Sequence, residues 1–75
     1  MDIKMLRAVI DDIEKNLEGE GYTVTVFTSG TFPYPNVALR RPADGMLIGD
    51  QALPNGKCLP IWIDLAHITA IRLED

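Results

Sequence analysis

The segment "LPNGKCLPIWIDLAHITAIRL", residues Leu53–Leu73, contains the clearest turn of the chain, flanked by runs of apolar and β-branched residues. The residues PNGK at 54–57 form a turn signal, because proline presets the first central position of a type I turn, asparagine suits the second and glycine accepts the left-handed position that follows. The turn predicts a hairpin between a strand over 48–53 and a strand over 59–65. A tight connection then leads to a closing strand over 68–73.

The residues upstream of this hairpin also indicate short strands. In YTVTVFTSG, residues 22–30, aromatic and β-branched side chains alternate with threonines, which predicts a half-buried strand that ends at the serine-glycine pair. Residues 32–36 carry two prolines, which cannot donate to a sheet ladder, so an irregular segment is expected there. An extended pattern resumes over 37–41, and a turn signal, PADG, separates it from a short apolar strand over 46–48.

Residues 2–18 predict an amphipathic helix. Apolar side chains recur at three- and four-residue intervals along one face, from Ile3 to Leu17. Asp2 suits the N-cap, because its carboxylate can accept hydrogen bonds from the first turn and complements the positive end of the helix dipole. The glycines that follow are expected to end the helix, since glycine readily adopts the left-handed conformation just past a helix.

One helix followed by about five short strands indicates an α+β protein with a single domain over residues 1–75. The helix is expected over about 2–18 and the strands over about 21–74. We expect the strands to form a strongly bent five-stranded antiparallel sheet. Such a sheet, with one helix to cover an opening, most economically curls into a small barrel.

Seventy-five residues lie near the lower limit for a self-sufficient hydrophobic core, and domains of this size usually need a disulfide, a metal or a partner subunit. Cys58 is the only cysteine, which excludes an internal disulfide, and its apolar neighbours predict a buried thiol. The cysteine and the single histidine show no metal-ligand spacing, so neither a metal nor a cofactor is expected. A homo-oligomer is therefore the expected source of stability, and the high hydrophobic content of 47% points the same way.

The net charge of -4 argues against broad, non-specific binding to nucleic acid, although it leaves room for a local basic patch. No apolar run approaches the roughly 18–20 residues of a membrane span, and no signal-peptide pattern opens the chain, so no membrane partner is expected. With one unpaired cysteine, we expect a cytoplasmic location. No nucleophile–base pair or phosphate-binding loop is present, so the chain is not expected to be an enzyme.

The segment IWIDLAHITAIRLE, residues 61–74, resembles the closing segment of the Sm-like family, the ring-forming RNA-binding proteins that include bacterial Hfq. In both, a long strand meets a tight turn and then a β-branched strand that begins with an isoleucine, here Ile68. The residues VTVFTSG at 24–30 are similar to the first strand of the family, which ends at a glycine. The resemblance spans most of the chain, and it implies an N-terminal helix, a small Sm/SH3-like barrel and a homo-oligomeric ring.

The chain departs from the family pattern where the family contacts RNA. Residues 31–42 lack the second glycine and the acidic residue that usually follow the first glycine. Ala66-His67 stands near the position of the Lys-His pair of the Hfq type, shifted by one position and without the lysine. The uridine-binding residues of the family therefore do not transfer directly to this chain.

Five residues are candidates for contacting RNA or a protein partner. Exposed aromatic rings can stack on bases while basic side chains meet phosphates. Each candidate also has a structural interpretation: the arginines can protect an edge strand, the histidine can be a surface residue, and the aromatic-proline run can serve as a turn. The five candidates are Phe32, Tyr34, Arg40, Arg41 and His67.

Trp62 is the candidate centre of a subunit interface. Alternation along the strand places Trp62 opposite Ile61 and Ile63, so a barrel that takes the isoleucines inside leaves the tryptophan outside and in need of a cover. Either the N-terminal helix or a neighbouring subunit can provide that cover, and interfaces are enriched in tryptophan. Trp62, Ile61 and Ile63 are the interface residues that the sequence predicts.

Two functions remain open from the sequence. The first is a non-enzymatic, oligomeric Sm-like module that binds single-stranded RNA or scaffolds a complex. The second is a small acidic protein–protein interaction module, such as an accessory or mobile-element protein, that does not bind nucleic acid. Substituting Arg40 and Arg41 discriminates between them, because only the first function predicts a loss of RNA affinity.

Overall fold

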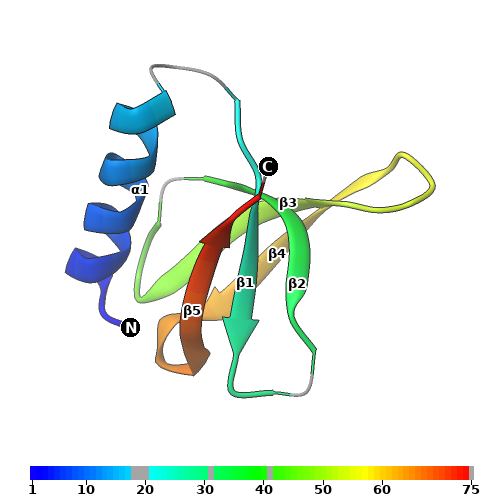
Figure 1. Ribbon diagram of the computed structural model, residues 1–75. Coiled ribbons are helices and arrows are strands. Elements are labelled where there is room, and N and C mark those ends of the chain that lie inside the picture. Colours follow the sequence, from blue (N-terminus) through cyan, green and yellow to red (C-terminus); the bar gives the residue numbers. More distant parts are fainter. Residues whose placement is uncertain (18–20, 31, 41, 75) are drawn as a thin grey trace.

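Helix α1 (Ile3–Leu17) opens the structure, a computed structural model that describes residues 1–17, 21–30, 32–40 and 42–74 (Figure 1). Asp2 caps the helix, since its carboxylate oxygen Oδ1 accepts a hydrogen bond of 2.8 Å from the backbone N–H of Met5. The predicted helix is confirmed as far as Leu17, and its predicted last residue and Gly19 lie outside the described ranges. No helix within these ranges is both long and apolar enough to cross a membrane.

Five antiparallel strands follow the helix and form one sheet in the order β4-β3-β2-β1-β5. Their bounds are β1 (Val24–Thr28), β2 (Tyr34–Leu39), β3 (Met46–Ala52), β4 (Cys58–Asp64) and β5 (Ile68–Leu73). A single 3-10 turn, η1 (Leu65–His67), joins β4 to β5. The α+β class and the order of one helix followed by a five-stranded antiparallel sheet are therefore confirmed.

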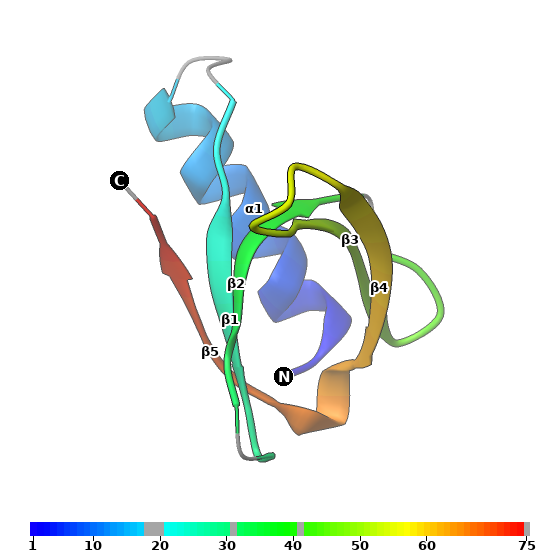
Figure 2. The same cartoon turned by 90° about the vertical axis from the view of Figure 1, so that its right-hand side faces the viewer.

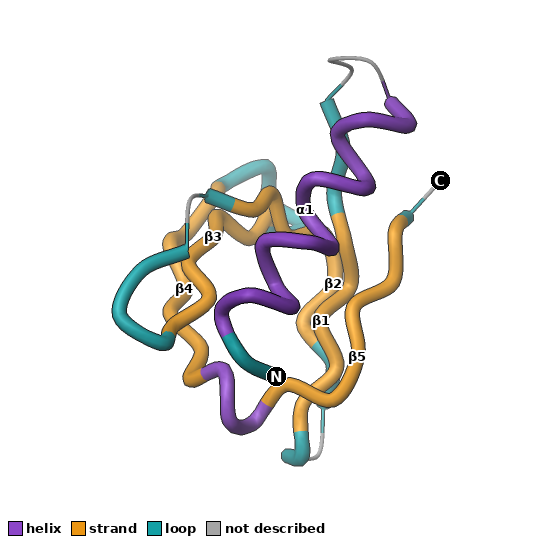
Figure 3. The backbone as a smooth tube through the Cα atoms, turned by 90° about the vertical axis from the view of Figure 1, so that its left-hand side faces the viewer, coloured by secondary structure: helices purple, strands orange, loops and turns teal. Residues whose placement is uncertain are grey.

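The sheet curls strongly, as Figure 2 shows, but it does not close into the expected barrel. Within the described residues, β4 and β5 form the two edges of the sheet and do not pair with each other. Between the two edge strands lies η1, where Asp64 Oδ1 accepts a 2.9 Å hydrogen bond from the N–H of Ala66 and the chain turns after β4. The chain then continues as β5, which pairs with β1. Helix α1 lies across the opening that the curled sheet leaves (Figure 3).

Leucine and β-branched side chains fill the space between the concave face of the sheet and α1. The predicted alternation in β1 is confirmed, because Val24 and Val26 are both fully buried. Each fully buried valine or leucine contributes roughly 1.5–3 kcal/mol relative to an exposed one. The buried core consists of Leu6, Val24, Val26, Val37, Leu47, Ile63, Leu65 and Ile68.

The predicted β3–β4 hairpin is confirmed. The N–H of Leu53 donates to the carbonyl of Lys57 at 2.8 Å, and the N–H of Gly56 donates to the carbonyl of Leu53 at 3.0 Å. Gly56 has a φ of 86°, a conformation that side chains with a Cβ rarely adopt, so glycine suits this position of the turn. The hairpin extends away from the rest of the sheet, at the side of the molecule opposite α1 (Figure 1).

Strand β2 begins earlier than the sequence predicts, because it includes Tyr34 and Pro35 from the segment expected to be irregular. A bulge accommodates the proline: the register between β1 and β2 slips by one residue at this point. Asn36 takes a left-handed φ of 58°, and its N–H donates to the carboxylate oxygen Oε2 of Glu74 at 2.9 Å. The carboxylate of Glu74 therefore accepts the hydrogen bond that the N–H of Asn36 would otherwise donate within a regular β1–β2 ladder.

Leu6→Ala is expected to lower the free energy of unfolding by about 2–4 kcal/mol, because Leu6 is the one fully buried side chain in the described part of α1. Its neighbour Met5 is 55% exposed and provides the control, since Met5→Ala is expected to change that free energy by no more than about 0.5 kcal/mol. Urea unfolding followed by circular dichroism measures both values. Equal losses for the two variants would contradict the docking of α1 through Leu6.

Candidate functional site

The free edge of β4 carries unpaired backbone groups at alternate residues. Hydrogen-bonded and non-hydrogen-bonded pairs alternate along an antiparallel ladder. Two backbone hydrogen bonds mark the ends of the β3–β4 ladder. At the hairpin end the N–H of Leu53 donates to the carbonyl of Lys57, and at the other end the N–H of Leu65 donates to the carbonyl of Gly45. The register between the two strands is continuous, and the hydrogen-bonded residues at its two ends, 57 and 65, are both odd-numbered. Because hydrogen-bonded pairs recur at every second residue, the odd-numbered residues of β4 bond to β3. The residues of β4 whose backbone turns to the free edge are Cys58, Pro60, Trp62 and Asp64.

Pro60 reduces the capacity of this edge to pair with another strand. Proline has no N–H, so the edge lacks a donor at this position while the proline carbonyl is still available as an acceptor. The donors that remain on the edge are the N–H groups of Cys58, Trp62 and Asp64. An incoming strand can therefore pair with β4, but it pairs best on the side of Trp62 towards η1.

The free edge of β5 is not interrupted by proline. The N–H of Glu74 donates to the carbonyl of Thr23 at 3.1 Å, which fixes the hydrogen-bonded positions of the β1–β5 pair. By the same alternation, Ile71 and Leu73 turn their backbone N–H and carbonyl groups away from β1. Both edges of the sheet are therefore open to further strand pairing.

Exposed apolar side chains gather on these two edge strands. The described chain has six large hydrophobic residues that are exposed, and three of them, Leu59, Trp62 and Leu73, lie on β4 or β5. Trp62 is 59% exposed, and α1 does not cover it. Of the other predicted interface residues, Ile63 belongs to the core and Ile61 is half-buried against it. The surface available at this predicted interface is thus centred on Trp62.

An open depression brings together three of the residues singled out in the sequence, Tyr34, Trp62 and His67. It lies where β1, β2, β4 and η1 meet, and the Nδ1 atom of His67 is 3.3 Å from the hydroxyl oxygen of Ser29. Phe32, which is 78% exposed, does not line it. The described residues that line it are Thr28, Ser29, Gly30, Tyr34, Trp62, Ile63, Asp64 and His67, with no lysine or arginine among these eight.

Arg40 does not join these aromatic residues. Its guanidinium forms two hydrogen bonds with the carboxylate of Asp50, at 2.6 and 2.7 Å, across the β2–β3 pair. The hydrogen bond and the charge of Asp50 raise the pKa of Arg40 above its ordinary value, so the arginine keeps a charge that Asp50 neutralises locally. Arg41, the other predicted contact, lies outside the described residues.

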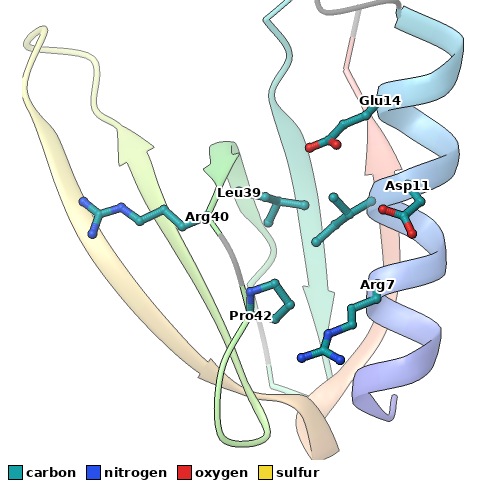
Figure 4. Close-up of a pocket in the computed structure, with 7 residues that line it drawn as sticks. Arg7, Asp11, Glu14, Leu39, Arg40 and Pro42 are labelled. Carbon is teal, nitrogen blue, oxygen red and sulfur yellow. The ribbon is translucent and has the colours of Figure 1, made fainter.

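A groove separates α1 from the end of β2, and we call it the helix–sheet groove (Figure 4). It has a volume of about 590 Å³. Ile10 and Leu39, which are half-buried, pack against the core and provide an apolar floor. The groove is lined by Arg7, Ile10, Asp11 and Glu14 of α1 and by Leu39, Arg40 and Pro42.

The charged groups of the groove are arranged along its length. In Figure 4 the guanidinium of Arg7 and the carboxylate of Glu14 extend from α1 towards the groove, whereas Arg40 extends the opposite way, towards Asp50. The charge of Glu14 also acts on Tyr22, because burial first and this carboxylate second raise the pKa of the phenol. Sequence reasoning missed the groove, although the seven-residue spacing of Arg7 and Glu14 signals two charges on one side of a helix.

Cys58 is exposed, so the prediction of a buried thiol is wrong. The apolar residues that follow it suggested burial, but Cys58 starts the free edge strand close to the hairpin turn, where nothing packs over it. Within the described part of the chain, no three histidine, cysteine, aspartate or glutamate side chains gather in a group that could hold a metal ion.

Comparison of the chain with protein-family models, with curated proteins and with solved structures found no match in any of the three. The resemblance to the Sm-like family stays a prediction.

Proposed function

We propose that this chain is a non-enzymatic module that associates with copies of itself through the two free edges of its sheet and so scaffolds a complex. The observation that carries the proposal is that both edge strands combine unpaired backbone groups with exposed apolar side chains. Proteins usually protect such edges with charges, bulges or covering segments, because unprotected edges pair with other chains. Here Pro60 is the one such device at the centre of β4.

Pairing of β4 with β5 of a second copy uses both edges at once. The two edges differ from each other, so the contact is head-to-tail, and repetition of it leads to a closed ring or an open chain. A ring leaves no edge unpaired, which agrees with the ring that the Sm-like resemblance implies. The added strand also gives a 75-residue domain the partner that its small core calls for.

The charges at the strand ends favour an antiparallel contact. In that direction the start of β4, at Lys57, meets the end of β5, at Glu74. Lys57 has no carboxylate within 4 Å in the described part of its own chain. Opposite charges at facing strand positions contribute roughly 0.2–1 kcal/mol, and they fix direction more than they add affinity.

Trp62→Ala is expected to weaken self-association by about tenfold or more, because buried tryptophans are prominent among the residues that dominate interfaces. Phe32→Ala is the matched control, since Phe32 is equally aromatic and more exposed but lies on neither edge strand. Light scattering over a range of protein concentrations measures the mass of each variant. A wild-type chain that remains monomeric at millimolar concentration, or equal effects of the two substitutions, would contradict the proposal.

Binding of single-stranded RNA is the second candidate function, and the depression that gathers Tyr34, Trp62 and His67 favours it. Aromatic rings can stack on bases without sequence preference. The charges do not favour it, because Asp64 lines the same depression and Asp50 neutralises Arg40. We therefore place RNA binding second to self-association.

Titration of the chain with oligouridylate, followed by the fluorescence of its single tryptophan, tests the second candidate. If the depression binds RNA, His67 is the one basic side chain among the described residues that line it, so log K should fall with log salt with a slope no steeper than about -0.7. His67→Ala should then remove that slope and Tyr34→Ala should weaken binding. A steep slope unaffected by His67→Ala would place RNA elsewhere on the chain.

A further inference from the structure

We infer that the helix–sheet groove is a docking site for a short extended peptide segment that carries a basic residue, two apolar residues and an acidic residue in succession. The inference goes beyond self-association, because the groove involves neither β4 nor β5. It rests on the shape of the groove, its apolar floor and the opposite charges at its two ends.

The separation of the two charges sets the length of the segment. Arg7 and Glu14 lie seven residues apart on α1, which corresponds to about 10.5 Å along the helix axis. Residues three apart in a polyproline II-like peptide return to the same side of the chain after about 9 Å. A basic and an acidic residue with two residues between them therefore match the two ends of the groove.

The charges of the groove set the direction of the segment. Arg7 attracts the acidic residue, and Glu14, with Asp11 beside it, attracts the basic one. Neither Arg7 nor Glu14 has an oppositely charged group within 4 Å in the described part of the chain, so both remain available to a ligand. Among the described lining residues, the two carboxylates of Asp11 and Glu14 also disfavour a phosphate-bearing ligand such as RNA.

The floor of the groove selects an apolar residue in the middle of the segment. The two middle residues of a segment with three residues per turn point to different sides, so making both apolar ensures that one of them meets the floor. Ile10 and Leu39 are continuous with the core, and Pro42 is buried beside them. Arg40 adds the aliphatic part of its side chain, because Asp50 holds its guanidinium outside the groove. The volume of about 590 Å³ falls within the 300–1,000 Å³ typical of ligand pockets, so the groove has room for an apolar side chain and the adjoining backbone.

The test uses the peptide acetyl-Lys-Leu-Leu-Glu-amide and the full chain, with binding followed by NMR chemical shifts of the labelled protein. We expect a dissociation constant on the order of 0.1–1 mM, as suits a ligand of this size. The largest shifts should fall on Ile10 and Leu39. The peptide acetyl-Lys-Ser-Ser-Glu-amide lacks the apolar residues and should bind at least about fivefold more weakly.

A variant in which one charge of the groove is reversed should change which peptide the groove binds. Glu14→Lys should weaken binding of the Lys-Leu-Leu-Glu peptide by about five- to tenfold, and it should create binding of acetyl-Glu-Leu-Leu-Glu-amide, which the unmodified groove rejects. Asp12→Lys is the matched control, because it changes the charge of α1 by the same amount at an exposed residue that does not line the groove. The control should retain the original preference.

Three results would overturn the inference. The first is no chemical-shift change at Ile10 and Leu39 up to about 5 mM peptide, a concentration well above the expected dissociation constant. The others are chemical-shift changes centred on Trp62, or equal effects of Glu14→Lys and Asp12→Lys on binding. The measurement is repeated on Trp62→Ala, which is expected to be less associated. Peptide binding that persists there supports the groove whatever the fate of the self-association proposal. Binding that vanishes with Trp62 would assign the peptide to the sheet edge and contradict the groove.

Discussion

The alternation of hydrogen-bonded and non-hydrogen-bonded pairs along the β3–β4 ladder determines both the core and the free edge of the sheet. One register decides that Ile63 is buried and bonded to β3, and that the backbone of Trp62 faces outward. The same register places Pro60 where its missing N–H costs the sheet no internal bond. A slip of one residue would bury the tryptophan face and expose the isoleucines, so the core and the free edge are specified together.

The open sheet explains both surfaces that we propose. Because β4 and β5 do not pair with each other in the described part of the chain, the sheet has two edges that a closed barrel would have paired. Because a single helix of 15 residues covers the opening, its apolar face does not fill the whole space, and the groove beside Ile10 and Leu39 remains. Incomplete closure therefore leaves a backbone surface for strand pairing and a side-chain surface for a peptide.

The sequence predicted local structure well and long-range pairing poorly. The cap at Asp2 and the turn after Pro54 depend on neighbouring residues, so their signals are readable directly. The ion pair of Arg40 with Asp50 joins residues ten apart through the β2–β3 register, which no local pattern specifies. Whether β4 and β5 pair with each other is likewise a long-range property of the sheet, which no local pattern specifies. The exposure of Cys58 depends on β4 being an edge strand, which composition alone could not indicate.

Amide hydrogen exchange, measured residue by residue over a range of protein concentrations, tests the claim of edge pairing most directly. If the edges pair, the amides of Trp62, Asp64, Ile71 and Leu73 exchange quickly in dilute solution and become protected as the concentration rises. The amides of Ile61 and Ile63, which bond to β3, should be protected at every concentration. Outward-facing amides that exchange at the same rate in dilute and concentrated solution would contradict the account.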